Sequence, residues 1–480
     1  MKKNNIMPCS LVWLKDDLRV SNNQALSALI EDQNNKKNAI YIYENDFYNY
    51  SEAQRWWLAK SLEIFKEKLK NLKISLDVIH EKTPKIFKKL IEDKFFNRVY
   101  WNKSCHINEN KVEEDIKKIL NNNNIFFKEF DANLLNPIQK IKKDDGTPFK
   151  VFTHYWKKAE QIYLKDNYED NYKHNYKILK NSYQNLSKDK NILAIYPKKN
   201  WHKKFEKYWE PSEENAEKIL NNFIKNSIEK YAVNRDIPSV NGTSKLSPYL
   251  KFGQISVHHI MRKLLEIKNK KIGYRKYINE IGWREFSHSL LYNFPEMEKC
   301  NLRKEFNNFK WNKDEKLFSK WKKGLTGYPI VDAGMRELYE TGWMHNRVRM
   351  ITASFLVKHL RIHWLEGEKY FRNTLLDFNT ANNVSGWQWV AGTGADAAPY
   401  FRIFNPILQG EKFDKKGEYV KKWCPELINI PDDYLHKPWE MPDALQNEKN
   451  IIIGKTYPFP IVDHQQARNS ALKAFQDLKK

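Results

Sequence analysis

Residues 10–43 read SLVWLKDDLRVSNNQALSALIEDQNNKKNAIYIY, and this stretch decides the fold of the first part of the chain. It begins with the apolar run SLVWL and ends with NAIYIY, with a segment of helical character between them. Three more apolar runs follow, SLDVIH at 75–80, RVYW at 98–101 and IFFKEF at 125–130. Strand runs that alternate with helical segments indicate a parallel sheet with crossover helices. We therefore predict a Rossmann-like α/β domain over residues 1–131.

The rest of the chain loses this alternation. Residues 132–200 carry Pro137 and the turn sequence Gly146-Thr147-Pro148, with weak apolar periodicity, which predicts an interdomain linker. From residue 201 onward, amphipathic segments are separated by turn signals such as YNFPEM and LTGYPIVDAG, so we predict an all-α domain over residues 201–480. No G-x-G-x-x-G follows the first strand, and a dinucleotide site of the usual kind is not expected there.

The composition indicates two kinds of binding partner, a polyanion and a planar molecule. The net charge is +24, which attracts nucleic acid phosphates, although lysines scattered over a solvated surface explain the charge equally well. Aromatic residues make up 14% of the chain and include 16 Trp, more than core packing usually needs. Flat rings of this kind stack on bases and flavins.

Membrane, export and metal signals are absent from the sequence. No apolar stretch approaches the ~20 residues of a spanning helix, and Lys15, Asp16 and Asp17 interrupt the first apolar run before a signal-peptide core could form. The cysteines lie far apart without a C-x-x-C pair. We expect a cytoplasmic protein that has no membrane segment, disulfide framework or metal site.

A glycine at position 242 introduces the first candidate site. Gly242 precedes Thr243, Ser244 and Lys245, and Ser247 follows shortly after. Hydroxyls and backbone N–H groups at a helix start bind phosphate oxygens, and a lysine adds positive charge. The same residues fit an ordinary helix cap. Taken alone, they leave both interpretations open.

Helical spacing brings further polar side chains onto common faces. Glu280 and Trp283 are three residues apart, and Asn346 and Met350 are four apart, so each pair shares a helix face. A carboxyl such as Glu280 in an apolar pocket can be protonated and donate a hydrogen bond to a substrate carbonyl. Trp283 offers a stacking surface for an extruded base. The alternative is a core tryptophan beside a surface glutamate.

These motifs, with LDFNTANN at 376–383, GWQW at 386–389 and GADAAPYFRIFNP at 394–406, closely resemble the photolyase/cryptochrome family. The resemblance covers almost the whole chain and is closest to bacterial class I photolyases, which repair cyclobutane pyrimidine dimers. It implies an α/β domain, a long linker and a helical FAD-binding domain. The residues that it implies for FAD binding are Tyr231, Thr243, Ser244, Lys245, Leu246, Ser247, Tyr277, Arg349, Asp377, Phe378, Asn379 and Asn383.

The same resemblance implies roles in the reaction. Asn383 faces the reactive flavin nitrogen, and Glu280, Asn346 and Met350 complete the implied catalytic set. His345 is expected to be structural. An electron-hopping chain from the surface to the flavin is implied for three indoles, Trp311, Trp364 and Trp387.

Two features near the flavin are specific expectations. The resemblance implies that Arg349 pairs with Asp377 close to the flavin ring, where reduced flavin holds negative charge. The family commonly has an aspartate where this chain has Asn379, so flavin affinity or redox tuning is expected to differ.

DNA contacts and an antenna pigment complete the implied site. The DNA-binding residues are Arg235, Trp283, Arg284, Asn346, Arg347, Trp389 and Arg402. Asn108, Glu109 and Lys299 resemble positions that bind a methenyltetrahydrofolate antenna. An 8-hydroxy-5-deazaflavin antenna and an empty antenna site are the alternatives. A monomer is expected.

The expected function is light-driven repair of cyclobutane pyrimidine dimers in DNA. Three alternatives are kept. A cryptochrome-type photosensor shares the fold and FAD, but Asn383, Glu280 and Met350 favour repair. Repair of (6-4) photoproducts is disfavoured by the Asn346–Met350 pattern. A flavin-containing DNA-binding protein without turnover is the third.

Overall fold

The computed structural model describes residues 9–32, 36–44, 50–166, 190–268 and 270–478. It divides the chain into two compact units. Unit 1 comprises residues 1–147, 154–222 and 245–269, and unit 2 comprises residues 148–153, 223–244 and 270–480. Part of the predicted linker, residues 167–189, lies outside the described residues. The domain bounds drawn from the sequence stay a prediction.

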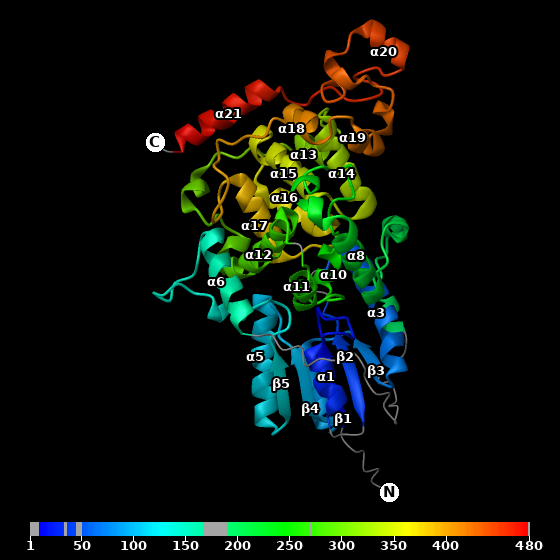
Figure 1. Ribbon diagram of the computed structural model, residues 1–480, viewed down its shortest axis with the longest axis vertical. Coiled ribbons are helices and arrows are strands. Elements are labelled where there is room, and N and C mark those ends of the chain that lie inside the picture. Colours follow the sequence, from blue (N-terminus) through cyan, green and yellow to red (C-terminus); the bar gives the residue numbers. More distant parts are fainter. Residues whose placement is uncertain (1–8, 33–35, 45–49, 167–189, 269, 479–480) are drawn as a thin grey trace. The chain divides into compact units, whose positions relative to one another are not determined.

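Unit 1 contains a five-stranded parallel sheet, as the apolar runs predicted (Figure 1). Its strand order is β3-β2-β1-β4-β5, and all four neighbouring pairs are parallel. The strands are β1 (Cys9–Leu14), β2 (Lys37–Ile42), β3 (Ser75–Ile79), β4 (Phe96–Asn102) and β5 (Phe126–Phe130). Strands β2 and β3 are added on one side of β1, and β4 and β5 on the other, so the order in which strands are added reverses between β1 and β4. Parallel sheets bind ligands beyond the carboxyl ends of the strands at such a reversal.

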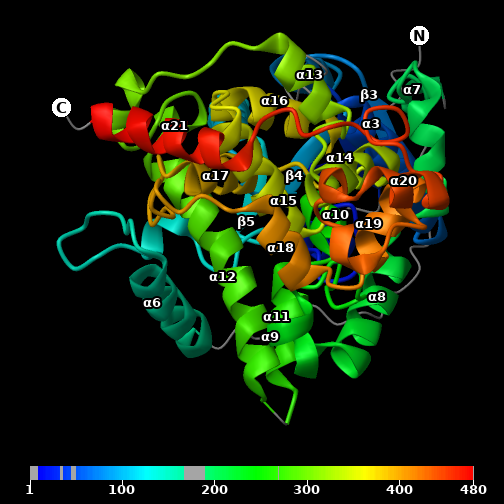
Figure 2. The ribbon, with the colours of Figure 1, turned by 90° about the horizontal axis from the view of Figure 1, so that it is seen from above.

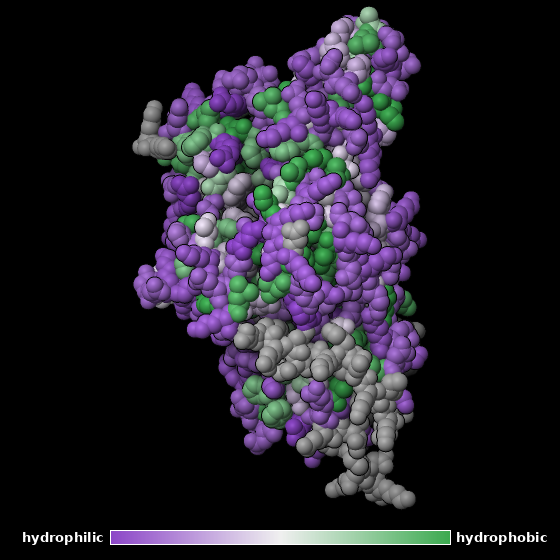
Figure 3. All heavy atoms as spheres, in the orientation of Figure 1, coloured by the Kyte–Doolittle hydropathy of each residue, from purple (hydrophilic) through white to green (hydrophobic). Residues whose placement is uncertain are grey.

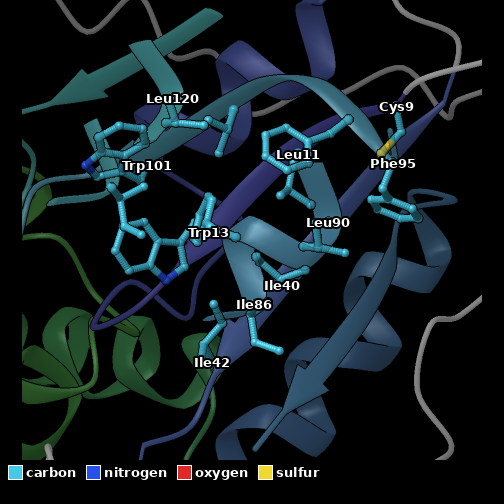
Figure 4. Packing of buried hydrophobic residues seen from close by; sticks show 14 residues of the cluster. Cys9, Leu11, Trp13, Ile40, Ile42, Ile86, Leu90, Phe95, Trp101 and Leu120 are labelled. Atoms are coloured by element: carbon cyan, nitrogen blue, oxygen red, sulfur yellow. The ribbon is translucent and has the colours of Figure 1, made fainter. Parts of the chain in front are cut away.

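Crossover helices cover the sheet and close its core. They are α1 (Gln24–Glu31), α3 (Glu52–Asn71), α4 (Thr83–Glu92) and α5 (Ile107–Asn122). Trp13 of β1 meets the edge of Phe87 of α4 at a ring-centroid distance of 5.2 Å, and Leu11, Trp101 and Leu120 pack in the same cluster (Figure 4). Each such side chain contributes ~1.5–3 kcal/mol by burial, which fixes the register of the strands.

The remaining helices of unit 1 come from later in the chain. They are α7 (Lys190–Leu193), α10 (Ser247–Lys251), α11 (Val257–Leu265) and most of α6 (Phe152–Lys165) and α8 (Glu213–Asn226). Gly253 lies against the backbone of Asp16, where an added Cβ would sit 2.0 Å from the carbonyl oxygen, so only glycine fits there.

Unit 2 consists of helices joined by loops, and its described residues hold isolated bridges but no strand, which confirms the fold class (Figure 2). Its helices are α9 (Tyr231–Asn234), α12 (Ile272–Asn293), α13 (Glu315–Lys322), α14 (Pro329–Thr341), α15 (Asn346–Ser354), α16 (Trp364–Thr374), α17 (Thr380–Ala391), α18 (Pro406–Phe413), α19 (Glu418–Trp423), α20 (Asp443–Lys449) and α21 (His464–Asp477). A π-helical turn, Phe355–His359, follows α15 directly.

The surface is predominantly hydrophilic on the face shown in Figure 3, with small hydrophobic areas among the charged side chains. Among the described helices, none combines the length and apolar character that crossing a membrane requires.

Candidate active site

A cavity of about 180 Å³ opens among α15, α16 and α17 in unit 2. This is below the ~300 Å³ at which whole ligand pockets begin, so the cavity holds only part of a large ligand. It unites many of the implied residues, namely Asn346, Arg349, Met350, Asp377, Phe378, Asn379, Asn383 and Trp387. It adds residues to which the sequence assigned no role, namely Ala353, Phe371, Leu375, Asn382, Gly386 and Val390.

The start of α15 is held by a buried carboxylate that sequence reasoning missed. Oε2 of Glu337, on α14, accepts hydrogen bonds from the backbone N of His345 at 3.1 Å and from the Tyr419 hydroxyl at 2.7 Å. Glu337 is 7% exposed. His345 is the N-cap of α15, so this bond fixes the residue at which the helix begins. It thereby fixes the orientation of the helix face that Asn346 and Met350 share. Glu337 and Tyr419 are far apart in sequence, so no local spacing signals the pair.

Arg349 and Asp377 form the ion pair that the resemblance implied. Nη2 of Arg349 lies 2.8 Å from Oδ2 of Asp377, whose side chain is 3% exposed. Nε of Arg349 donates to the carbonyl oxygen of Met344 at 2.7 Å, which fixes the plane of the guanidinium. A fixed cation at the cavity wall suits a ring that becomes negatively charged on reduction.

Asn383 is oriented by a second buried carboxylate, Glu368. Nδ2 of Asn383 donates to Oε1 of Glu368 at 3.0 Å and to its backbone carbonyl at 3.3 Å. Burial raises the pKa of Glu368, while Arg372, 2.9 Å away, opposes that shift. Both hydrogen bonds use the amide nitrogen, so the amide orientation leaves the carbonyl oxygen for a donor such as a flavin N–H. The residues present therefore fit a flavin ring.

Asn379, the departure from the family pattern, caps a helix. Its side-chain oxygen accepts from the backbone N of Asn382 at 3.1 Å at the start of α17. An aspartate would cap equally well, since both residue types lead at N-caps. The substitution therefore removes a charge beside the cavity without altering the start of the helix.

Replacing Asn383 by aspartate is expected to lower the free energy of unfolding by about 1–3 kcal/mol at pH 8, because a donor becomes an acceptor facing buried Glu368. Stability should recover as the pH falls, since one of the two carboxylates then takes up a proton. Urea unfolding at several pH values measures this. Asn382→Asp makes the same charge change at an exposed position and serves as the control; equal losses in both variants would contradict the prediction.

The hydroxyl-rich stretch after Gly242 is divided between the units. Thr243 and Ser244 belong to unit 2, and Lys245, Leu246 and Ser247 belong to unit 1. The hydroxyl of Tyr277 donates to Oγ of Ser244 at 3.0 Å, and Tyr231 meets Tyr277 edge-on at 5.2 Å. Helix α10 has Leu246 as its N-cap, and this residue makes no side-chain capping bond.

Glu280 does not lie in the apolar pocket expected from its helix face. Its carboxylate forms an ion pair with Nη1 of Arg235 on the surface of α12, and its side chain is 27% exposed. Arg235 also lies 3.8 Å from Asp236, which accepts a bond from Arg347 at 2.8 Å. The expectation failed because Arg235 comes from another segment, which helical spacing cannot reveal. Glu280, Arg235 and Arg347 thus form one charged network.

The other implied DNA contacts come from several elements of unit 2. Trp283 is half-buried on α12, and Trp389 is half-buried on α17. Arg284 pairs with neighbouring Glu285 at 2.9 Å, and Arg402 is exposed. The ring of Phe152 covers one face of Trp283, a contact that the sequence did not indicate.

Two of the three implied electron-transfer indoles are buried, and the third reaches the surface. Trp387 is 2% exposed and Trp364 is fully buried, whereas Trp311 is partly exposed. His363 lies between the last two, with its ring 4.9 Å from Trp311 and 5.6 Å from Trp364. Burial lowers the pKa of His363 to about 4, so the imidazole between the indoles is neutral near pH 7. Trp321, which the sequence did not single out, meets Trp387 at 6.3 Å.

The implied antenna residues fall in both units. Glu109 is buried with Oε2 lacking a hydrogen-bond partner among the described residues, and burial raises its pKa. Asn108 is exposed, and Lys299 is exposed in unit 2. Asp16 lies near Glu109, and although burial would raise its pKa, Lys251 at 2.7 Å and His106 hold it down to about 2.

Asp16, His106 and Glu109 also place ligand atoms within 4.8 Å of one another. Lys251 already supplies a positive charge to this group, because its ammonium lies 2.7 Å from Asp16. The expectation of no metal site stays a prediction.

Comparison with known proteins identifies the family. A family model described as the FAD binding domain of DNA photolyase matches residues 277–477, and one described as DNA photolyase matches residues 10–172. The chain is 40% identical over 474 residues to a deoxyribodipyrimidine photo-lyase from Agrobacterium fabrum, with 98% of each chain covered. It is 32% identical to cryptochrome-1 from Arabidopsis thaliana over 96% of this chain and 69% of that protein. The crystal structure of a class III photolyase from Agrobacterium tumefaciens superposes with a TM-score of 0.91 at 38% identity, covering 98% of each chain.

The chain therefore belongs to the photolyase/cryptochrome family and carries its FAD-binding domain. Its enzyme class is DNA photolyase, since several curated relatives bear that name. The class I assignment made from the sequence is not confirmed, because a similar solved structure belongs to class III.

Proposed function

We propose that this protein repairs cyclobutane pyrimidine dimers in DNA using light and fully reduced FAD. The observation that carries the proposal is the cavity that unites Asn346, Met350 and Asn383 with the Arg349–Asp377 pair. The first two side chains share one face of α15, and Asn383 is oriented by Glu368. FAD, when reduced and excited, supplies the electron that splits the dimer.

The chain's own residues bind and orient in this proposal. Arg349 supports negative charge on the reduced flavin ring, and Glu368 holds the amide of Asn383 so that its oxygen accepts a hydrogen bond. Trp283 and Trp389 stack on the extruded lesion, and the cations Arg235, Arg284, Arg347 and Arg402 contact phosphates without reading base sequence. When DNA is bound, its phosphates replace carboxylates as the ion-pair partners of some of these arginines.

An antenna pigment in unit 1 extends the proposal. Glu109 follows β4 at the place where the strand order reverses, which is the usual ligand position of a parallel sheet. Its Oε2, which has no hydrogen-bond partner in the described part of the chain, suits the N–H groups of methenyltetrahydrofolate, our first choice. An 8-hydroxy-5-deazaflavin antenna or an empty site are the alternatives. The monomeric state and cytoplasmic location stay predictions.

Light-dependent repair tests the proposal directly. Purified, photoreduced protein is mixed with an oligonucleotide that contains one thymine dimer, and dimer loss is followed under blue light and in the dark. We expect repair only in light. Repair should be about threefold to tenfold slower in Glu280→Ala, because this variant removes the side chain that holds Arg235, one of the proposed phosphate contacts.

Glu305→Ala is the matched control, because Glu305 forms an exposed ion pair with Arg303 at 2.7 Å in the same unit. Its repair rate should equal that of the unmodified protein. Loss of a (6-4) photoproduct instead of the dimer would assign the other repair activity. Absence of any repair with reduced FAD bound would reject the proposal in favour of a cryptochrome-type photosensor.

A further inference from the structure

Trp283 is covered on one face by the ring of Phe152. The two ring centroids lie 3.9 Å apart, and the ring planes differ by 7°. Most aromatic pairs in proteins are offset or edge-to-face, with centroids ~4.5–7 Å apart. This pair is a close, parallel stack, in which Phe152 occupies one face of the indole.

Phe152 is itself fixed in place. It is 8% exposed, and its backbone N donates to Oδ2 of Asp396 at 3.1 Å. Phe286, one turn after Trp283 on α12, meets both rings edge-on, at 6.0 Å from Phe152 and 5.9 Å from Trp283. The short segment 148–153 groups with unit 2, although residues on both sides of it belong to unit 1. Its docking therefore depends on contacts of this kind.

The stack restricts the indole before any DNA arrives. Trp283 is half-buried, so without Phe152 the ring would lose its closest packing partner and have access to more rotamers. A base that stacks on a mobile ring must also order that ring, whereas a ring held in its bound orientation avoids that entropy loss. Asp396 adds a link to the segment GADAAPYFRIFNP, which includes Arg402.

We infer that Phe152 is a positioning residue for damage recognition: its ring holds the plane of Trp283 so that the opposite indole face stacks on the extruded pyrimidine dimer. The inference rests on the proposed function, since it assumes that Trp283 contacts the lesion. It assigns Phe152 no contact with DNA or flavin. It also predicts that Phe152 affects binding of damaged DNA and leaves the general attraction to undamaged DNA unchanged.

Binding in the dark tests this without any photochemistry. Affinities are measured for a duplex with one thymine dimer and for the same duplex undamaged. Base–aromatic stacking carries ~1–3 kcal/mol per base, and because Phe152→Leu weakens that stack only in part, we expect about fivefold weaker binding of damaged DNA. Binding of undamaged DNA should not change. Phe306→Leu is the control, since Phe306 is also a buried phenylalanine but belongs to a different aromatic cluster of unit 2.

A double-mutant cycle separates positioning from a merely structural role. If Phe152 acts through Trp283, Phe152→Leu combined with Trp283→Leu binds damaged DNA no more weakly than Trp283→Leu alone. Phe152→Tyr, which keeps the flat ring, should restore discrimination even if Phe152→Leu lowers the melting temperature. Unchanged discrimination in Phe152→Leu, or additive losses in the double variant, would overturn the inference. If the unmodified protein bound damaged and undamaged DNA equally well, the result would reject the proposed function, and the inference that rests on it would be rejected as well.

Discussion

Arg349→Met is expected to lower the free energy of unfolding by about 3–5 kcal/mol, because it leaves the carboxylate of Asp377 buried without its cation. The side chain of Asp377 is only 3% exposed, so water cannot replace the guanidinium. Bound FAD should fall in parallel, since Arg349 lines the cavity in which we propose that the flavin ring binds. Urea unfolding and the flavin-to-protein absorbance ratio measure the two effects.

The double variant Arg349→Met, Asp377→Leu is the control. Removing both members of a buried ion pair is often nearly neutral, so most of the lost stability should return. Some loss should persist, because the carbonyl oxygen of Met344 also loses its donor. FAD should stay weakly bound in the double variant. A double variant less stable than the single one would show that the ion pair is not the cause.

Acidification is expected to destabilise the protein through His359. Burial, followed by the charges of His464 and Lys358, lowers the pKa of His359 to about 3. Nε2 of His359 lies 2.9 Å from Nδ1 of His464, at the start of α21. The imidazole is therefore neutral when folded and takes up a proton on unfolding below its ordinary value of about 6.5. Its stabilising contribution is complete above pH 6.5 and is lost progressively as the pH falls toward 3.

At pH 5 this loss amounts to about 2 kcal/mol relative to pH 7, from 1.36 kcal/mol per pH unit below the unfolded value. Asp414 acts in the opposite direction, because burial raises its pKa to about 6. The prediction is therefore a difference: between pH 7 and pH 5 the unmodified protein loses about 2 kcal/mol more than His359→Gln. Urea unfolding at both pH values measures it. Equal pH dependence in the two proteins would rule out His359 as the source.

The sequence predicts the helices and strands more completely than it predicts the contacts of the site. Strands β1 to β5 follow from short apolar runs, and β1 and β2 are buried along their whole length, as in a parallel sheet covered on both faces. Helix α3 follows from apolar residues at helical spacing. The pairing of Arg349 with Asp377 followed from the family resemblance.

Contacts between distant segments were not predicted. Tyr419 is 82 residues from Glu337, and Arg235 is 45 residues from Glu280. A spacing rule reports neighbours three or four residues apart and is silent about partners from other helices. The apolar pocket expected around Glu280 was wrong for this reason, and the stack of Phe152 on Trp283 gave no signal.

The alternation of the two units along the chain constrains the order of events during synthesis. Unit 2 includes residues 148–153, which leave the ribosome long before α12 does. At ~5–20 residues per second, the interval between Phe152 and Trp283 lasts on the order of ten seconds. During that time the aromatic ring of Phe152 has no partner, while the strands of unit 1 are already complete. Cotranslational folding of the first unit must therefore leave this short segment undocked, and a nascent chain that buried it early would leave Trp283 without the ring that stacks on it.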